Sequence, residues 1–177
     1  VDFQTIPSNT FYSNIYKIGD PLTPVHTFMD LSIKISKDEL QDKDKYVVVS
    51  LNKKNLINRV SLCKYVDGFA VAKVRELGKF AVFKDVTPPY VGPLQTKNLR
   101  QTNRIVMKMG DGMSGIKSYK GYVDGKWVLF EYDQKTGTAF CNLSVENVEK
   151  DNTLKTFKFV VTDNCNNERV YEKKILY

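Results

Sequence analysis

The feature that most limits how this chain can fold is an Asp-Gly pair, Asp124-Gly125. It lies between two runs of β-favouring residues, 117–123 and 126–132, within SGIKSYKGYVDGKWVLFEYD. A two-residue Asp-Gly turn needs a positive φ at both positions, which glycine adopts freely and aspartate tolerates, and its twist matches that of paired strands. The pattern therefore predicts a β-hairpin in which Tyr122 lies opposite Trp127.

The register of this hairpin assigns its side chains to two faces, because side chains alternate along a strand. The face expected to pack on the core holds the pairs Val123/Lys126, Gly121/Val128, Tyr119/Phe130 and Lys117/Tyr132. The other face holds the pairs Tyr122/Trp127, Lys120/Leu129 and Ser118/Glu131.

Short β-favouring runs continue along the rest of the chain, and we expect no helix longer than a turn or two. Several runs alternate apolar and polar residues, as half-buried strands do, and Asp67-Gly68 predicts a second hairpin. The expected strands cover residues 10–18, 27–36, 46–51, 60–65, 69–77, 80–84, 93–98, 105–109, 117–123, 126–132, 138–143, 154–162 and 169–176. This pattern predicts an all-β chain built from β-sandwiches.

Residues 85–93, DVTPPYVGP, are rich in proline and so cannot sustain a strand ladder; such a stretch forms a short, stiff linker. We therefore expect two consecutive immunoglobulin-like β-sandwich domains. The expected divisions are a lead-in segment at 1–21, a first β-sandwich domain at 22–85, a Pro-rich linker at 86–93 and an immunoglobulin-like domain at 94–177.

The formal net charge of +7 raises the question of nucleic acid binding. The excess is spread evenly along the chain, without a basic block or a candidate recognition helix, so we expect no nucleic acid partner. Mild attraction to an anionic envelope polymer stays open. No run approaches the roughly 18–20 apolar residues of a membrane span. The sequence begins at Val1 without a signal peptide, so we expect a processed product or an engineered fragment whose targeting comes from elsewhere.

The three cysteines, Cys63, Cys141 and Cys165, cannot all pair with one another. A Cys141–Cys165 disulfide in an oxidising compartment is one possibility, and buried or free thiols are the other.

Metal ligands are sparse in this sequence. His26 is the only histidine, and no Cys-x-x-Cys pair is present, so a zinc site is not expected. Asp111 and Asp163 lie in polar loops of the kind that bind calcium, although aspartate is also a common turn residue. We expect no metal and no cofactor, with calcium as the open alternative.

Catalytic motifs are also absent from the sequence. A Ser-His-Asp or Cys-His site would have to be built on His26, which stands beside prolines away from any nucleophile motif. Glu131 and Asp133 are explained as solvated charges on the hairpin rather than as a glycosidase pair. We therefore expect no enzyme and assign no catalytic residue.

Three segments in this order carry a family resemblance: KFAVFKDVTPPYVGPL, DGMSGIKSYKGYVDGKWVLFEYD and FVVTDNCNN. They resemble the C-terminal β-sandwich region of Gram-negative bacterial zinc metallopeptidases of the lysostaphin/LytM-like type. PLTPVHTFMDLSIKIS and VAKVRELGKFAVFKD are similar to that region too, so the resemblance covers nearly the whole chain and thins over residues 1–20. It implies tandem β-sandwich domains downstream of a peptidoglycan-cleaving catalytic domain, in an exported, periplasmic or envelope-associated protein.

The family's chemistry does not transfer to this chain. Its zinc site uses a His-x-x-x-Asp motif followed by His-x-His, and neither can be assembled around the single His26. The resemblance therefore implies an accessory region without the catalytic domain. Either a catalytic domain was left out of this sequence, or the protein is a stand-alone relative that lacks one.

Two functions follow from these observations. The first is a non-catalytic cell-envelope module that positions or scaffolds a peptidoglycan-cleaving metallopeptidase through contacts with a protein partner or a cognate catalytic domain. The second is a carbohydrate-binding module that contacts peptidoglycan through Tyr122, Trp127 and Lys120. An exposed aromatic pair would suit stacking on sugars. A lone tryptophan on an immunoglobulin-like strand is more often packed, so we expect this pair to be packed, either in the core or against the first domain.

Overall fold

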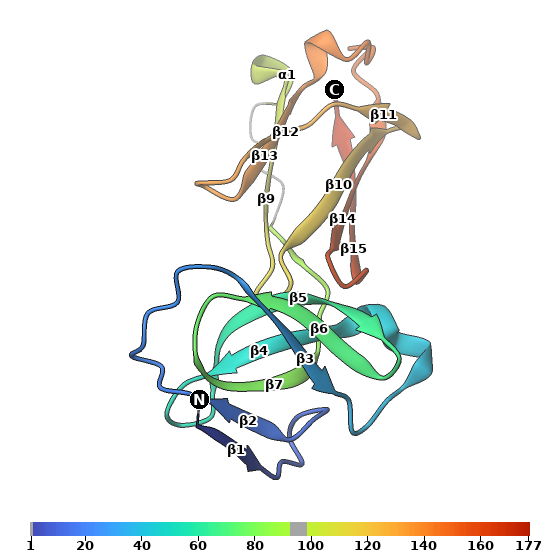
Figure 1. Ribbon diagram of the computed structural model, residues 1–177. Coiled ribbons are helices and arrows are strands. Elements are labelled where there is room, and N and C mark those ends of the chain that lie inside the picture. Colours follow the sequence, from blue (N-terminus) through green and yellow to red (C-terminus); the bar gives the residue numbers. More distant parts are fainter. Residues whose placement is uncertain (1, 93–98) are drawn as a thin grey trace. The chain divides into compact units, whose positions relative to one another are not determined.

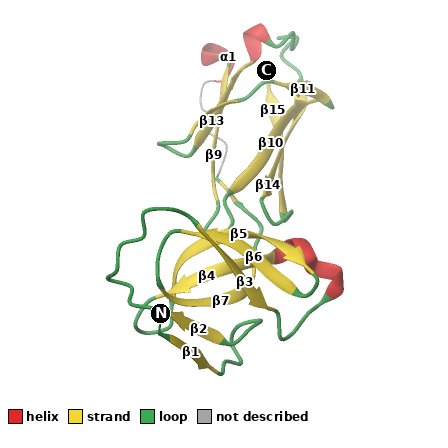
Figure 2. Cartoon of the chain, in the orientation of Figure 1, coloured by secondary structure: helices red, strands yellow, loops and turns green. Residues whose placement is uncertain are grey.

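The computed structural model describes residues 2–92 and 99–177 and divides the chain into two compact units, Val1–Val86 and Thr87–Tyr177 (Figure 1). Almost all regular structure is β-strand, as Figure 2 shows, and the sheets are antiparallel, which confirms the all-β prediction. No helix within the described ranges is long and apolar enough to cross a membrane. The strand expected at 93–98 lies outside the described residues.

In the first unit, the described strands form one seven-stranded sheet with the order β1-β2-β7-β4-β5-β6-β3. The strands are β1 (Phe3–Ile6), β2 (Ile15–Ile18), β3 (Met29–Lys34), β4 (Tyr46–Leu51), β5 (Ile57–Val66), β6 (Phe69–Val74) and β7 (Gly78–Lys84). A short 3-10 helix at Leu40–Lys45 leads into β4.

Strand β4 is the centre of this sheet because its sequence, YVVVSL, tolerates burial on both sides. Its three valines are β-branched residues that favour strands, and every residue of β4 is buried between β5 and β7. Val48, together with Phe80 and Val82 of β7, belongs to the hydrophobic core of the unit. The second predicted hairpin is also confirmed: Asp67 and Gly68 have φ of 45° and 82°, and Val66 pairs with Phe69.

The second unit is a β-sandwich of two four-stranded sheets, ordered β11-β10-β14-β15 and β12-β13-β9-β8 among the described residues. Its strands are β8 (Tyr90–Val91), β9 (Arg104–Gly110), β10 (Ile116–Val123), β11 (Lys126–Val128), β12 (Glu131–Asp133), β13 (Thr138–Asn142), β14 (Leu154–Asp163) and β15 (Glu168–Leu176). Two short helices complete it, α1 (Leu99–Thr102) and a 3-10 turn at Leu143–Val145.

The core of this unit is filled by alternate residues of facing strands. Phe157, Phe159 and Val161 of β14 are fully buried, as are Ile105 and Met107 of β9. Because strand side chains alternate, the residues between them on β14 lie on the outer face of their sheet.

The predicted turn and the first three pairs of the central hairpin are confirmed. Asp124 and Gly125 have φ of 47° and 78°. Strand β10 pairs with β11 through Val123/Lys126, Tyr122/Trp127 and Gly121/Val128.

Beyond Val128 the predicted strand is wrong, because β11 ends there and the chain crosses to the other sheet. The Leu129 amide donates a hydrogen bond to Oε2 of Glu146 at 2.8 Å, and β12 then pairs with β13. The ladder pairs expected at Lys120/Leu129, Tyr119/Phe130, Ser118/Glu131 and Lys117/Tyr132 are therefore not formed. The crossing turns Phe130 into the core, where it is 5% exposed.

Strand pairing within each unit includes residues from the expected lead-in segment or from the expected linker. Residues 1–21 contribute β1 and β2 to the first sheet, and β8, within the Pro-rich stretch, pairs with β9 of the second unit. The immunoglobulin-like identity of the sandwich stays a prediction.

Candidate functional site

The outer face of the sheet β11-β10-β14-β15 carries the residues that the sequence singled out for binding. Tyr122 and Lys120 alternate with Gly121 and Val123, which face the core, so both point to the opposite side. Trp127 joins them because its neighbour Val128 is buried and faces the core. We call this surface the aromatic face and define it by Lys120, Tyr122, Trp127, Lys158 and Glu172.

The strand registers align these side chains into a row across all four strands of the sheet. Trp127 pairs with Tyr122, Tyr122 with Lys158, and Lys158 with Glu172. Lys120 stands in the next row, opposite Val160. Residues directly opposite each other on one face have Cβ atoms about 5 Å apart, so the row is a continuous surface.

Neither aromatic side chain is packed in the core of the second unit, which corrects that part of our expectation, whereas packing against the first unit stays a prediction. The Trp127 side chain is 58% exposed, and Tyr122 is half-buried beside it. The core needs no tryptophan at this position, because Phe130, Phe157 and Phe159 already fill the interior behind β10; the rings of Phe130 and Phe159 lie 4.8 Å apart.

Beside the aromatic pair lies an open hollow of about 460 Å³. Its lining includes Lys120, Tyr122, Thr156, Lys158, Glu168 and Glu172. Charges of both signs thus stand next to an aromatic ring. None of the salt bridges found in the described part of the chain uses these lysines or glutamates.

The two loops considered for calcium lie close together in the second unit. Oδ2 of Asp111 accepts hydrogen bonds from the amides of Met113 and Gly115, at 3.0 and 2.7 Å. Oδ1 of Asp163, which is fully buried, accepts from the amides of Cys165 and Asn167, both at 2.8 Å. These bonds assign both carboxylates to loop structure, and calcium binding stays a prediction.

The histidine and the three cysteines considered in the sequence analysis do not belong to the aromatic face. His26 is exposed in the loop between β2 and β3 of the first unit. Cys141 and Cys165 are buried thiols rather than partners in a disulfide, and Cys63 is half-buried on β5.

The first unit has a hollow that the sequence did not indicate, of about 690 Å³. Ser50 of β4 lies at its wall, and within the described ranges its buried hydroxyl has no hydrogen-bond partner. Lys17, Lys79 and Glu76 border the opening. These residues come from separate strands and loops, so no local motif could have found them.

Comparison with known protein families gives a match that covers the first unit only. Residues 1–85 match the family model of the Zu5-like domain. That stretch is similar to this family over β1 to β7, and the match ends before the strands that carry the aromatic face. No curated protein matches the chain.

Proposed function

We propose that this chain is a non-catalytic module of the bacterial cell envelope and that its aromatic face binds the glycan of peptidoglycan. The observation that carries the proposal is the exposure of Trp127, at 58%, in register with Tyr122 on a paired strand. The resemblance of the sequence to accessory regions of peptidoglycan peptidases supplies the envelope setting.

The chemistry of the face suits a sugar. An exposed indole and phenol ring give a large, rigid apolar contact for the C–H face of a pyranose, at low cost in side-chain entropy. The ammonium groups of Lys120 and Lys158 donate hydrogen bonds, and the carboxylate of Glu172 accepts them. A sugar ring presents both requirements, since its faces are apolar and its rim carries hydroxyl groups.

The test is co-sedimentation of the full chain with insoluble peptidoglycan across a salt series. We expect the wild type to pellet at moderate salt and Trp127→Ala and Tyr122→Ala to remain in the supernatant. Phe28→Ala is the matched control, because Phe28 is an aromatic residue 64% exposed in the first unit. Binding that disappears with salt and is unchanged by Trp127→Ala would show only nonspecific electrostatic attraction between a cationic protein and a polyanion. That result would contradict the proposal.

A second candidate is a scaffold that holds a peptidase through protein contacts. It is favoured by β15, which is an edge strand of its sheet among the described residues and whose Val170 is 44% exposed. The unpaired backbone of an edge strand is a template for pairing with a partner strand. Failure of the wild type to pellet at any salt, with capture of a catalytic domain by the chain, would favour this candidate over glycan binding.

A further inference from the structure

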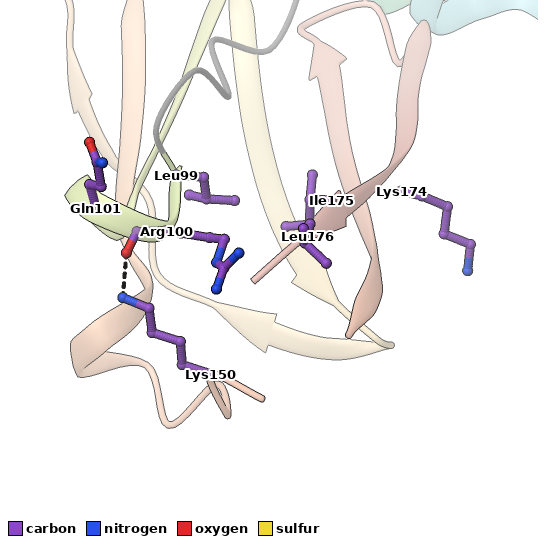
Figure 3. A pocket seen from close by; sticks show the side chains of 7 residues that line it. All are labelled: Leu99, Arg100, Gln101, Lys150, Lys174, Ile175 and Leu176. Atoms are coloured by element: carbon purple, nitrogen blue, oxygen red, sulfur yellow. Dashed lines mark hydrogen bonds between the residues drawn. The ribbon is translucent and has the colours of Figure 1, made fainter. Parts of the chain in front are cut away.

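A separate hollow of about 730 Å³ lies in the second unit, between α1 and the end of β15 (Figure 3). Its cationic side chains are Arg100 of α1, Lys150 of the loop before β14, and Lys174 of β15. Within the described part of the chain its lining contains no aspartate or glutamate. The hollow is therefore positively charged, and such a surface concentrates anions.

The two lysines of this hollow form hydrogen bonds with neutral groups rather than with carboxylates. Lys150 donates from Nζ to the carbonyl of Arg100 and to Oδ1 of Asn103, the latter at 3.0 Å, and Nζ of Lys174 donates to the Thr156 hydroxyl. An ammonium group has three N–H donors, so Lys150 keeps one for a ligand. The Lys174 side chain points away from Arg100 and Lys150, as Figure 3 shows.

Arg100 is the side chain best placed to receive an anion. Figure 3 shows it extending from α1 towards the end of β15, and no salt bridge within the described residues involves it. A guanidinium group presents a planar fork of donors that matches the two oxygens of a carboxylate or phosphate. The bond from Lys150 to the Arg100 carbonyl holds the backbone that carries this fork.

The wall of the hollow is apolar. Leu99 and Ile175 are buried core residues that also line the hollow. Leu176 lines it too and is 44% exposed. A ligand that fills this space therefore gains from an apolar body as well as from a charged group.

From this combination we infer that the hollow binds a small organic anion, a carboxylate or phosphate group joined to an apolar body, with Arg100 as its main anchor. This site is distinct from the aromatic face and does not depend on glycan binding.

The experiment titrates the full chain with acetate, hexanoate, hexyl phosphate, inorganic phosphate and hexylamine, and follows binding by calorimetry and by the methyl NMR signals of Leu99, Ile175 and Leu176. We expect hexanoate or hexyl phosphate to bind most tightly, acetate and inorganic phosphate more weakly, and hexylamine not at all. The two hexyl ligands distinguish a carboxylate from a phosphate site.

Variants locate the site. Arg100→Gln should weaken binding by about tenfold or more, since a charge-assisted hydrogen bond is lost. Lys135→Gln removes one exposed positive charge elsewhere in the same unit and should leave binding unchanged. Equal weakening by Arg100→Gln and Lys135→Gln, equal binding of hexanoate and hexylamine, or methyl signals that do not shift would each overturn the inference.

Discussion

The ring of Phe130 occupies the space above Gly121, where a side chain would otherwise stand. A Cβ atom on Gly121 would lie 2.3 Å from Cε2 and 2.5 Å from Cδ2 of that ring. Gly121 pairs with Phe159 on β14, and the Phe130 and Phe159 rings are 4.8 Å apart. The glycine thus admits the aromatic ring that closes the core after the chain leaves β11.

Gly121→Ala should lower the free energy of unfolding of the second unit by about 1–3 kcal/mol, because Phe130 must move within a packed core. Urea denaturation followed by the NMR signals of Phe157 and Val161, which are buried in this core, reports on this unit. Gly110→Ala is the control, because a Cβ there meets no atom within 4 Å. Equal stability of the two variants would contradict the packing described.

Trp127 should be quenched by acrylamide in the folded chain almost as strongly as in urea, since its side chain is 58% exposed. The measurement is a Stern–Volmer titration of the native and the unfolded protein. A native indole shielded several-fold would show that the aromatic face is covered in solution. Added glycan fragments should reduce the quenching if they stack on the ring.

Asp163→Ala should destabilise the second unit by about 3 kcal/mol, because the buried carboxylate accepts charge-assisted hydrogen bonds from a loop that it closes. Asp111→Ala should cost less, since Asp111 is half-buried and water can replace part of its bonding. Urea denaturation of both variants gives the comparison, and a larger loss for Asp111→Ala would contradict it.

Acid should weaken the second unit partly through Asp151. Hydrogen bonds from Thr153, and then the ion pair with Lys155 at 3.1 Å, lower the pKa of Asp151 to about 2 from an ordinary 3.8. A carboxyl whose pKa is lowered by folding stabilises the fold above its unfolded pKa, so this contribution is lost as pH falls from about 4 towards 2. Melting temperatures between pH 5 and pH 2 should fall less steeply for Asp151→Asn than for the wild type. Identical slopes would assign the acid sensitivity to other groups.

Cys141 should resist alkylation until the chain unfolds. Burial, with a smaller effect from Glu146, raises the pKa of this thiol to about 12 from an ordinary 9.0. Since the thiolate is the reactive form, iodoacetamide at pH 8 should modify the half-buried Cys63 first and Cys141 only in denaturant. Peptide mapping by mass spectrometry identifies the modified residue, and rapid native labelling of Cys141 would contradict its burial.

The raised pKa of the Cys141 thiol predicts that the second unit loses stability at alkaline pH. Its pKa is higher in the folded chain than in the unfolded one, so its contribution is complete below about pH 9 and is lost as the pH rises towards 12. Unfolding free energies measured at pH 8 and pH 10 should therefore differ more in the wild type than in Cys141→Ala.

The sequence by itself determined the local structure of this protein. The Asp-Gly turns set the hairpins because positive φ at two successive positions is a property of those residues, and alternation then placed Tyr122 opposite Trp127. The β-branched run at 46–51 predicted strand β4, and the strand has the same bounds in the structure.

Tertiary structure decided what no local pattern contains. After β11 the Phe130 ring fills the space beside Gly121, and this packing contact is not contained in the local pattern of either strand. The exposure of Trp127 follows from that packing, since the core is filled without it. The hollow around Arg100 is lined by residues of α1, of the loop before β14 and of the end of β15. These segments are far apart in the sequence, so only the folded chain brings them together.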